Sequence, residues 1–192
     1  YSDKDIFLRE VVSNGCDAIT KYRMTNPDDE SEMSVTVTVD KENKTLTISD
    51  TGIGMTEDEV KRYINQVAFS GASEFMKKFE GDEKKGDIIG HFGLGFYSVF
   101  MVSENVEIET LSCQEGAEPV HWESKDGMDF AISEGRRTTH GTSIILHISD
   151  EEKEFLELYR VREVLTRYCG YMAYPIYLMD ANAKPVEREE EI

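Results

Sequence analysis

Residues 35–59, VTVTVDKENKTLTISDTGIGMTEDE, carry the clearest secondary-structure signals of the chain. Aliphatic residues alternate with threonine or serine on both sides of the polar run DKENK, which predicts a β-hairpin with one buried face. The second strand leads directly into a glycine-containing loop, residues 50–55. Thr56 and Glu59 then have the spacing of a capping box, which predicts a helix that starts at Glu57.

Helical and strand patterns alternate on either side of this stretch. A long amphipathic helix over about residues 4–24 precedes it, with Ser2 or Asp3 as its cap. A glycine-punctuated connection over residues 70–95 is typical of a functional loop, and FYSVFMV after it opens a helix. Strands are predicted near 106–111, 120–125, 129–133, 142–148 and 174–179, with a helix over 151–168 before the last. Because helices interrupt the strands twice, we predict an open, mixed sheet with helices on one face.

The composition limits the possible partners. The chain has 39 acidic and 21 basic residues, a net charge of −18, which repels nucleic acid and anionic lipid. No apolar run approaches the roughly 18 residues of a membrane helix. Three cysteines at wide spacings favour free thiols in a reducing compartment. A triphosphate ligand would need a local device that offsets the negative charge, such as a metal ion or oriented backbone N–H groups.

A polar stripe runs along the predicted first helix. Its members, which fall within about 60° of one another at about 100° per residue, are Glu10, Asn14, Asp17 and Lys21. In one interpretation the stripe faces water. In the other it lines a cleft, where two carboxylates and an amide oxygen hold a water, a hard cation and part of a ligand. Periodicity alone does not separate the two interpretations.

Two glycine-containing loops are candidates for binding a nucleotide. Asp50 ends a strand and can accept a hydrogen bond from a purine amine, while the glycines at 52 and 54 let a flat ring approach the backbone. GHFGLGF, residues 90–96, presents glycines at a helix N-terminus, which suits phosphate. Ordinary tight turns are the alternative for both loops. The chain lacks G-x-x-x-x-G-K-[ST], which excludes a P-loop.

In their order along the chain, these features resemble the four nucleotide-binding motifs of the GHKL ATPases. The matching motifs are Glu10-x-x-x-Asn14-x-x-Asp17-Ala18, Asp50-x-Gly52-x-Gly54, Gly90-x-x-Gly93-x-Gly95 and Gly141-Thr142. That superfamily holds DNA gyrase B, MutL, histidine kinases and the heat-shock protein 90 chaperones. The segments DIFLREVVSNGCDA, DTGIGMT and GHFGLGFYSVFMV are similar to the chaperone branch, and VAFSGASEF is similar to its lid. The wording of the lid resembles the bacterial, HtpG-type chaperones more than the eukaryotic cytosolic form.

The resemblance implies a two-layer α/β (α+β) sandwich with helices on one face of a mixed, mostly antiparallel eight-stranded sheet. Residues 1–192 are expected to form a single N-terminal ATP-binding domain with a lid at about 65–95, and the middle and C-terminal domains to be absent. ATP or ADP and Mg²⁺ are the implied ligands. We expect the isolated domain to be monomeric and to hydrolyse ATP slowly. The full protein is implied to be a cytoplasmic homodimer that acts on unfolded clients, with possible co-chaperones.

The resemblance also implies residue roles. Glu10 matches the general base that activates the attacking water, and Asn14 matches the Mg²⁺ ligand. Asp50 matches the residue that binds the adenine amine, with Thr142 supporting it through water. The further nucleotide contacts that it implies are Asp17, Ala18, Lys21, Gly54, Met55, Ile64, Gly93, Leu94, Gly95 and Phe96.

Two positions depart from the family pattern. Phe69 stands where many members have a lysine, and Tyr63 stands where many have an asparagine. The departures put one phosphate contact and one hydrogen bond of the pocket wall in doubt.

Two alternative functions stay open. One is a GHKL enzyme that acts on DNA, such as a topoisomerase or mismatch-repair subunit, against which the net charge argues. The other is a nucleotide-sensing module without turnover, against which the presence of Glu10 argues.

Overall fold

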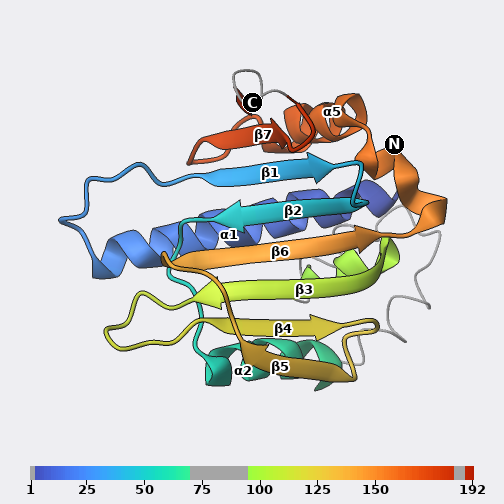
Figure 1. The fold of residues 1–192 in the computed structure, drawn as a ribbon. Coiled ribbons are helices and arrows are strands. Elements are labelled where there is room, and N and C mark those ends of the chain that lie inside the picture. Colours follow the sequence, from blue (N-terminus) through green and yellow to red (C-terminus); the bar gives the residue numbers. More distant parts are fainter. Residues whose placement is uncertain (1–2, 70–94, 184–188) are drawn as a thin grey trace.

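The structure is a computed structural model that describes residues 3–69, 95–183 and 189–192. Within these ranges, eight strands form one sheet in the order β5-β4-β3-β6-β2-β1-β7-β8 (Figure 1). Their bounds are β1 (Val35–Asp40), β2 (Thr45–Asp50), β3 (Ser103–Leu111), β4 (Val120–Ser124), β5 (Phe130–Glu134), β6 (Gly141–Ile148), β7 (Ile176–Asp180) and β8 (Glu189–Glu191). Every neighbouring pair is antiparallel except β1 and β7, which are parallel. The predicted mixed, mostly antiparallel sheet is confirmed.

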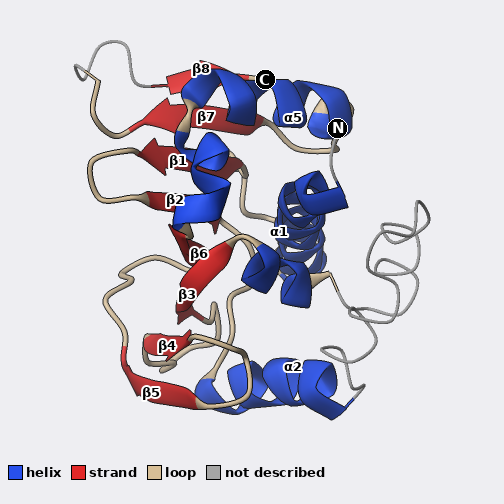
Figure 2. Cartoon of the chain, turned by 90° about the vertical axis from the view of Figure 1, so that its right-hand side faces the viewer, coloured by secondary structure: helices blue, strands red, loops and turns tan. Residues whose placement is uncertain are grey.

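The helices lie on one face of this sheet, as Figure 2 shows for α1, α2 and α5. The helical elements of the described ranges are η1 (Asp3–Asp5), α1 (Ile6–Thr25), α2 (Glu57–Phe69), η2 (Phe96–Met101), η3 (Asp150–Leu156) and α5 (Leu158–Cys169). None of these helices combines the length and apolarity that crossing a membrane requires. The predicted two-layer arrangement is confirmed.

The core lies between the two layers, and the alternation in the β1–β2 hairpin shows why. Val35, Val37 and Val39 of β1 are buried, while the residues between them are only half-buried. The apolar side of α1 packs over this face, and its Phe7 meets Phe155 edge-on with ring centroids 5.0 Å apart. The hairpin and the helix therefore bury their apolar faces against each other.

The capping box of α2 is present as predicted. The backbone N–H of Thr56 donates to the side chain of Glu59 across 2.9 Å. In return, the N–H of Glu59 donates to the hydroxyl of Thr56 across 3.3 Å. The pair fixes the point at which the chain leaves the glycine-containing loop and enters α2.

One expectation about helices was inaccurate and another was confirmed. The single helix expected over residues 151–168 is the 3-10 helix η3 followed by α5, because Glu157 between them is extended at φ −96° and ψ 123°. The FYSVFMV segment forms a helix as expected, the 3-10 helix η2. Strand bounds differ from prediction by up to three residues, and β8, which lacks apolar alternation, was not predicted from pattern.

The three cysteines are free thiols, as predicted. Cys16 and Cys169 are buried, and burial raises the pKa of Cys16 to about 11 and that of Cys169 to about 12. Both therefore stay protonated at neutral pH. The predicted lid, the helical piece within it and the loop residues Gly90, Gly93 and Leu94 fall largely or wholly outside the described residues.

Candidate functional site

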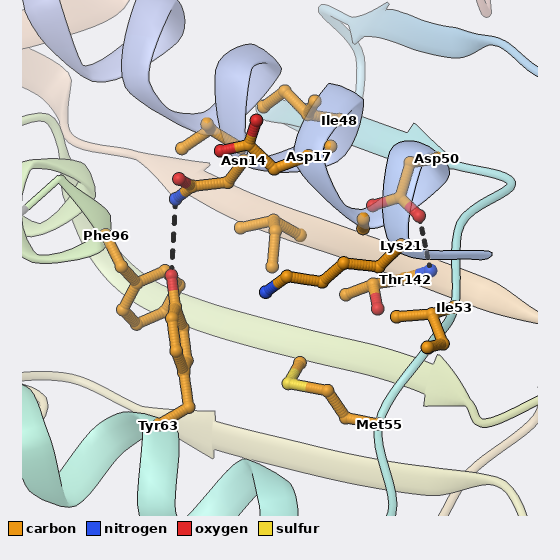
Figure 3. Close-up of a pocket in the computed structure, with 15 residues that line it drawn as sticks. Asn14, Asp17, Lys21, Ile48, Asp50, Ile53, Met55, Tyr63, Phe96 and Thr142 are labelled. Carbon is orange, nitrogen blue, oxygen red and sulfur yellow. Dashed lines mark hydrogen bonds between the residues drawn. The ribbon is translucent and has the colours of Figure 1, made fainter. Parts of the chain in front are cut away.

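A cavity of about 210 Å³ lies between α1, the end of β2, the glycine-containing loop and α2 (Figure 3). Its lining residues are Val11, Asn14, Gly15, Asp17, Ala18, Lys21, Ile48, Asp50, Ile53, Gly54, Met55, Tyr63, Phe96, Thr142 and Ile144. The lining is apolar along most of its walls, and a few polar groups converge on it. This combination is usual for small-molecule sites.

The polar stripe of α1 faces this cavity, which decides between the two interpretations of its periodicity. Asn14, Asp17 and Lys21 line the cavity, and Figure 3 shows Lys21 lying along it between Asp50 and Tyr63. Glu10, one turn before Asn14, does not line the cavity but lies beside it. Its carboxylate is paired with Arg9 across 3.1 Å and is largely covered, with its side chain 15% exposed.

Asp50, the last residue of β2, forms one end of the cavity. It is buried, and its Oδ1 accepts hydrogen bonds from the backbone N–H of Gly52 at 2.8 Å and of Thr142 at 3.3 Å. Burial raises the pKa of Asp50 to about 6, against the lowering effect of these hydrogen bonds and of Arg137. With Oδ1 occupied by two donors, Oδ2 is the oxygen placed to receive a hydrogen bond from a ligand.

Arg137 fixes the strand ends behind Asp50. Its guanidinium donates to the carbonyl oxygens of Asp50 and His140 at 3.0 and 2.9 Å. It also donates to the hydroxyls of Ser49 and Ser143 at 3.0 and 2.9 Å. Arg137 therefore joins β2 to β6 at the level of Asp50 and provides part of the charge that offsets the carboxylate.

The glycines of the loop after β2 are required by close backbone contacts. A Cβ on Gly52 would lie 2.6 Å from the backbone of Ala18, and Gly54 has φ +68° with space for a Cβ only 1.8 Å from the carbonyl oxygen of Leu111. Ile53 between them donates its N–H to the carbonyl of Ala18 across 3.0 Å. The loop is thereby pressed against α1 and β3, and it forms one wall of the cavity.

Thr142 and Thr110 support this wall from neighbouring strands. Their hydroxyl oxygens lie 2.8 Å apart, and both residues are buried. The backbone N–H of Met55 donates to the hydroxyl of Thr110 across 2.9 Å. The β3–β6 ladder therefore carries the position of the loop, and Thr142 stands next to Asp50 as its register partner.

Tyr63 of α2 closes the cavity at the end away from Asp50. The side-chain Nδ2 of Asn14 donates to its phenolic oxygen across 3.3 Å, and its ring lies 5.2 Å from that of Phe96. Burial raises the pKa of Tyr63, so the phenol stays neutral. Tyr63 therefore makes a hydrogen bond within the cavity wall, which the sequence alone did not show.

The structure brings together most residues of the predicted site. The predicted residues that line the cavity are Asn14, Asp17, Ala18, Lys21, Asp50, Gly54, Met55, Phe96 and Thr142. Ile64 does not line it and is buried in the core instead. Gly95 contacts the site through Glu10, since a Cβ on Gly95 would lie 2.7 Å from Oε2 of Glu10. Gly93 and Leu94 lie outside the described residues.

Sequence reasoning missed part of the cavity wall. The lining residues that it did not assign are Val11, Gly15, Ile48, Ile53 and Ile144. The apolar members alternate with core residues in the same elements, so no pattern distinguished them from the core. Gly15 had one available signal, its position next to Asn14 on the helix, where a Cβ would lie 3.3 Å from the Cβ of Asp50.

The geometry favours a ligand with a flat, amine-bearing ring at one end and an anionic group at the other. The end at Asp50 offers a buried carboxylate within apolar walls, which suits an exocyclic amine. The end at Asn14 offers an amide, the ammonium group of Lys21 and, beside them, the carboxylate of Glu10.

Comparison with known proteins agrees with this arrangement. Residues 3–152 match the family described as Histidine kinase-, DNA gyrase B-, and HSP90-like ATPase. The chain is 45% identical over 181 residues to "Chaperone protein HtpG" of Porphyromonas gingivalis, covering 92% of this chain and 26% of that protein. The same name belongs to relatives in Bacteroides fragilis, at 46% over 181 residues, and in Shewanella pealeana, at 42% over 199 residues. These alignments cover 92% and 100% of this chain.

The chain spans 26–31% of the length of these relatives. The match over residues 3–152 includes the polar face of α1, the loop after β2, η2 and the start of β6, which together form the cavity. The chain belongs to the family of histidine kinase-, DNA gyrase B- and HSP90-like ATPases.

Proposed function

We propose that this chain is the N-terminal ATP-binding domain of an HtpG-type chaperone and that its cavity binds ATP with the adenine at Asp50. The observation that carries the proposal is the buried carboxylate of Asp50, whose Oδ1 is held by two backbone N–H groups. A carboxylate held in this way costs stability through burial, and a ligand amine that donates to Oδ2 recovers part of that cost. Gly54 and Met55 provide the surface for the ring.

The phosphates would then extend toward α1 and α2. Lys21 lies along the cavity and would supply positive charge to the phosphates. It would compensate for the lysine that many relatives have at the position of Phe69. Asp17 lies on the same wall, where the resemblance places the ribose. This orientation separates the apolar base end of the cavity from its polar phosphate end.

Asn14 fits the role of a Mg²⁺ ligand. Because its Nδ2 donates to Tyr63, the amide is oriented with Oδ1 as the group available to a cation. Amide and phosphate oxygens are donors that this hard cation prefers. When bound, Mg²⁺ would supply charge neutralisation at the phosphates, and this chain would contribute the oxygen of Asn14 to hold it.

Glu10 is proposed as the residue that orients and deprotonates the attacking water. Phosphoryl transfer depends on positioning and charge more than on covalent chemistry, so one well-placed carboxylate is a sufficient base. Gly95 leaves room for this carboxylate, since any side chain there would collide with it. The ion pair with Arg9 helps to orient the carboxylate beside the cavity.

The activities of the longer protein are part of the same proposal. In the relatives named HtpG this domain is about a quarter to a third of the chain, so coupling to clients, co-chaperones and dimerisation depends on residues outside this domain. We propose slow turnover by the isolated domain, a cytoplasmic homodimer as the full protein, and unfolded proteins as its clients. The DNA-acting alternative is disfavoured by the net charge of −18.

Calorimetric titration with ADP and Mg²⁺ tests the binding proposal. The wild type should bind one ADP, and Asp50→Asn should abolish binding because an amide N–H₂ would face the adenine amine. Asn14→Ala should bind ADP equally with and without Mg²⁺. Asp129→Asn serves as the control, because the Asp129 carboxyl is exposed and does not line the cavity. Binding that is indifferent to Asp50→Asn would overturn the pocket assignment.

Turnover separates the chaperone ATPase from a sensing module. In the longer protein that contains this chain, Glu10→Gln should lower ATP hydrolysis by about 10²–10⁴-fold while ADP affinity is retained. Retained hydrolysis in that variant would show that another residue acts as the base.

A further inference from the structure

A group of histidine and glutamate side chains comes from positions of β3 and β4 that alternate with buried residues. These positions therefore face the side of the sheet that the helices leave uncovered, which is the side toward the viewer in Figure 1. Its central members are Glu107 of β3 and His121 and Glu123 of β4. Glu107 is the register partner of Glu123, and His121 lies two residues away on the same side of β4. Successive side chains of a strand point to opposite faces of the sheet, and register partners point to the same face. These three residues therefore point to the same side.

The three side chains are close enough to share one ion. One ligand atom from each residue can be chosen so that all three lie within 4.8 Å of one another. Nε2 of His121 is 2.9 Å from Oε1 of Glu107. The group is partly covered, with the side chain of His121 17% exposed and that of Glu107 18% exposed. Donors at the roughly 2.0–2.2 Å ligand distances of Zn²⁺ lie about 3.3 Å apart in a tetrahedral site, so small movements of these side chains bring them to a metal ion.

Each of the three residues is held by a further side chain. Nε2 of His147 lies 2.6 Å from Oε2 of Glu107, and Nδ1 of His121 lies 3.3 Å from the hydroxyl of Ser133. The amide of Asn105 donates to Oε2 of Glu123 across 3.2 Å. Partners of this kind orient the ligands of metal sites and fix the histidine tautomer.

The charge of the group also favours a cation. Glu107 stands opposite a second glutamate, and such like-charged neighbours destabilise a sheet unless a positive charge lies between them. The overall charge of −18 adds to the attraction for a dication.

We propose that Glu107, His121 and Glu123 form a second metal site, distinct from the nucleotide cavity, that binds Zn²⁺. One imidazole nitrogen and two carboxylate oxygens suit Zn²⁺, and a water would complete a tetrahedral set. Mg²⁺ and Ca²⁺ prefer oxygen ligands, so the imidazole favours Zn²⁺ over both. His147, Ser133 and Asn105 act as positioning residues through their hydrogen bonds to the ligands. The alternative is a network of His–Glu hydrogen bonds with no affinity for metal.

Calorimetric titration of the tag-free chain with ZnCl₂ at neutral pH, without nucleotide, tests the proposal. The wild type should bind one zinc ion at this site. His121→Gln and Glu123→Gln should each weaken binding by more than the roughly 10–100-fold that loss of a positioning residue costs, and Ser133→Ala should fall within that range. Glu104→Gln, an exposed glutamate on the same strand as Glu107, should bind zinc as the wild type does.

Two readouts distinguish loss of the site from other effects. ADP binding by His121→Gln should match that of the wild type, because the residue lies on the opposite face from the cavity, and this shows that the variant is folded. The absorption spectrum with Co²⁺ in place of zinc should lack the charge-transfer band of thiolate ligands, which excludes the three cysteines. Zinc binding that is unchanged in both His121→Gln and Glu123→Gln, or absent from the wild type, would overturn the proposal.

Discussion

Asn14 on α1 donates a hydrogen bond from Nδ2 to the phenolic oxygen of Tyr63 on α2, across 3.3 Å. The two residues are 49 positions apart in the sequence, and the bond joins the two helices at the polar end of the cavity. In this arrangement of the amide the carbonyl oxygen of Asn14 is turned away from Tyr63. Tyr63, which departs from the family pattern, therefore helps to position Asn14, which matches that pattern.

Tyr63→Phe should reduce the contribution of Mg²⁺ to nucleotide binding. Without the phenol the Asn14 amide can rotate, and a net loss of about 1 kcal/mol, or several-fold in affinity, is expected for one such hydrogen bond. Calorimetric titration with ADP should show the loss in Mg²⁺ and not in EDTA. Tyr97→Phe, a tyrosine of η2 that does not line the cavity, is the matched control. An equal loss with and without Mg²⁺ would mean that Tyr63 acts only as a wall.

Asp50→Asn should stabilise the domain above pH 6 even though it abolishes ADP binding. Burial raises the pKa of Asp50 from 3.8 to about 6, so the folded state binds more protons than the unfolded state between these values. The stability associated with this group is present below pH 3.8 and is lost as the pH rises through about 6. The variant lacks this loss and should gain up to about 3 kcal/mol at pH 7.5.

Urea denaturation at pH 4 and pH 7.5 checks this expectation. The difference in the free energy of unfolding between Asp50→Asn and the wild type should be large at the higher pH and small at the lower. Asp17→Asn, an exposed carboxyl on the wall of the same cavity, should show little difference at either pH. Parallel pH curves for Asp50→Asn and the wild type would contradict the assignment of the buried charge.

Gly95→Ala should lower ATP turnover more than nucleotide affinity. The backbone of Gly95 is helical, at φ −56° and ψ −45°, so alanine is tolerated there, but its methyl group would lie 2.7 Å from Oε2 of Glu10. The carboxylate must move, and a displacement near 1 Å can cost about 10²-fold in rate. Steady-state hydrolysis by the longer protein and ADP titration of this domain together measure the two effects. Gly170→Ala is the control, because Gly170 is also helical (φ −64°, ψ −17°) and its added Cβ would lie 3.1 Å from the nearest atom, the carbonyl oxygen of Thr166. A matched loss of affinity and turnover would contradict the proposed role of Glu10.

Arg160→Gln should strongly destabilise the fold. Its guanidinium pairs with Asp5 across 2.6 Å, and the two side chains are only 12% and 1% exposed. Removing one partner of a buried pair leaves an uncompensated charge and costs about 3–5 kcal/mol. Arg162→Gln is a matched control, because its pair with Glu190 is 39% and 47% exposed and such surface pairs contribute about 0–1 kcal/mol. Chemical denaturation of both variants gives the comparison, and equal losses would refute the distinction.

The parts of the fold that the sequence predicted are those in which local pattern and tertiary burial agree. In β1 and β2 the period of two coincides with the side that packs under α1, and the capping box marks the start of α2. The region 150–169 shows the opposite case. Its amphipathic pattern is continuous, but Glu152 is buried and forms an ion pair with Lys4, and the chain extends at Glu157 before α5 begins. The pattern predicted one helix in this region, and tertiary contacts divide it into η3 and α5.

The candidate site shows the same limit. The spacing of Asn14, Asp17 and Lys21 predicted a polar face but not what covers it, because the position of α2 and of the loop after β2 is not encoded in the spacing of α1. Tyr63 could be identified as a departure from the family, yet its hydrogen bond depends on where α2 packs. The glutamates and histidines on the open sheet face carried no motif, since strand pairing alone brings Glu107 beside His121.

The two ends of the nucleotide cavity rest on different kinds of structure, which bears on how the domain can change over evolution. Asp50 and Thr142 are register partners in the β2–β6 ladder, where a slip of one residue would turn every side chain to the other face. Asn14 and Tyr63 belong to two different helices on either side of the cavity, and helices can shift by about 1–2 Å relative to one another. Gradual substitutions in the core under the helices can therefore retune the polar end of the cavity, while the position that receives the base is kept or lost as a whole.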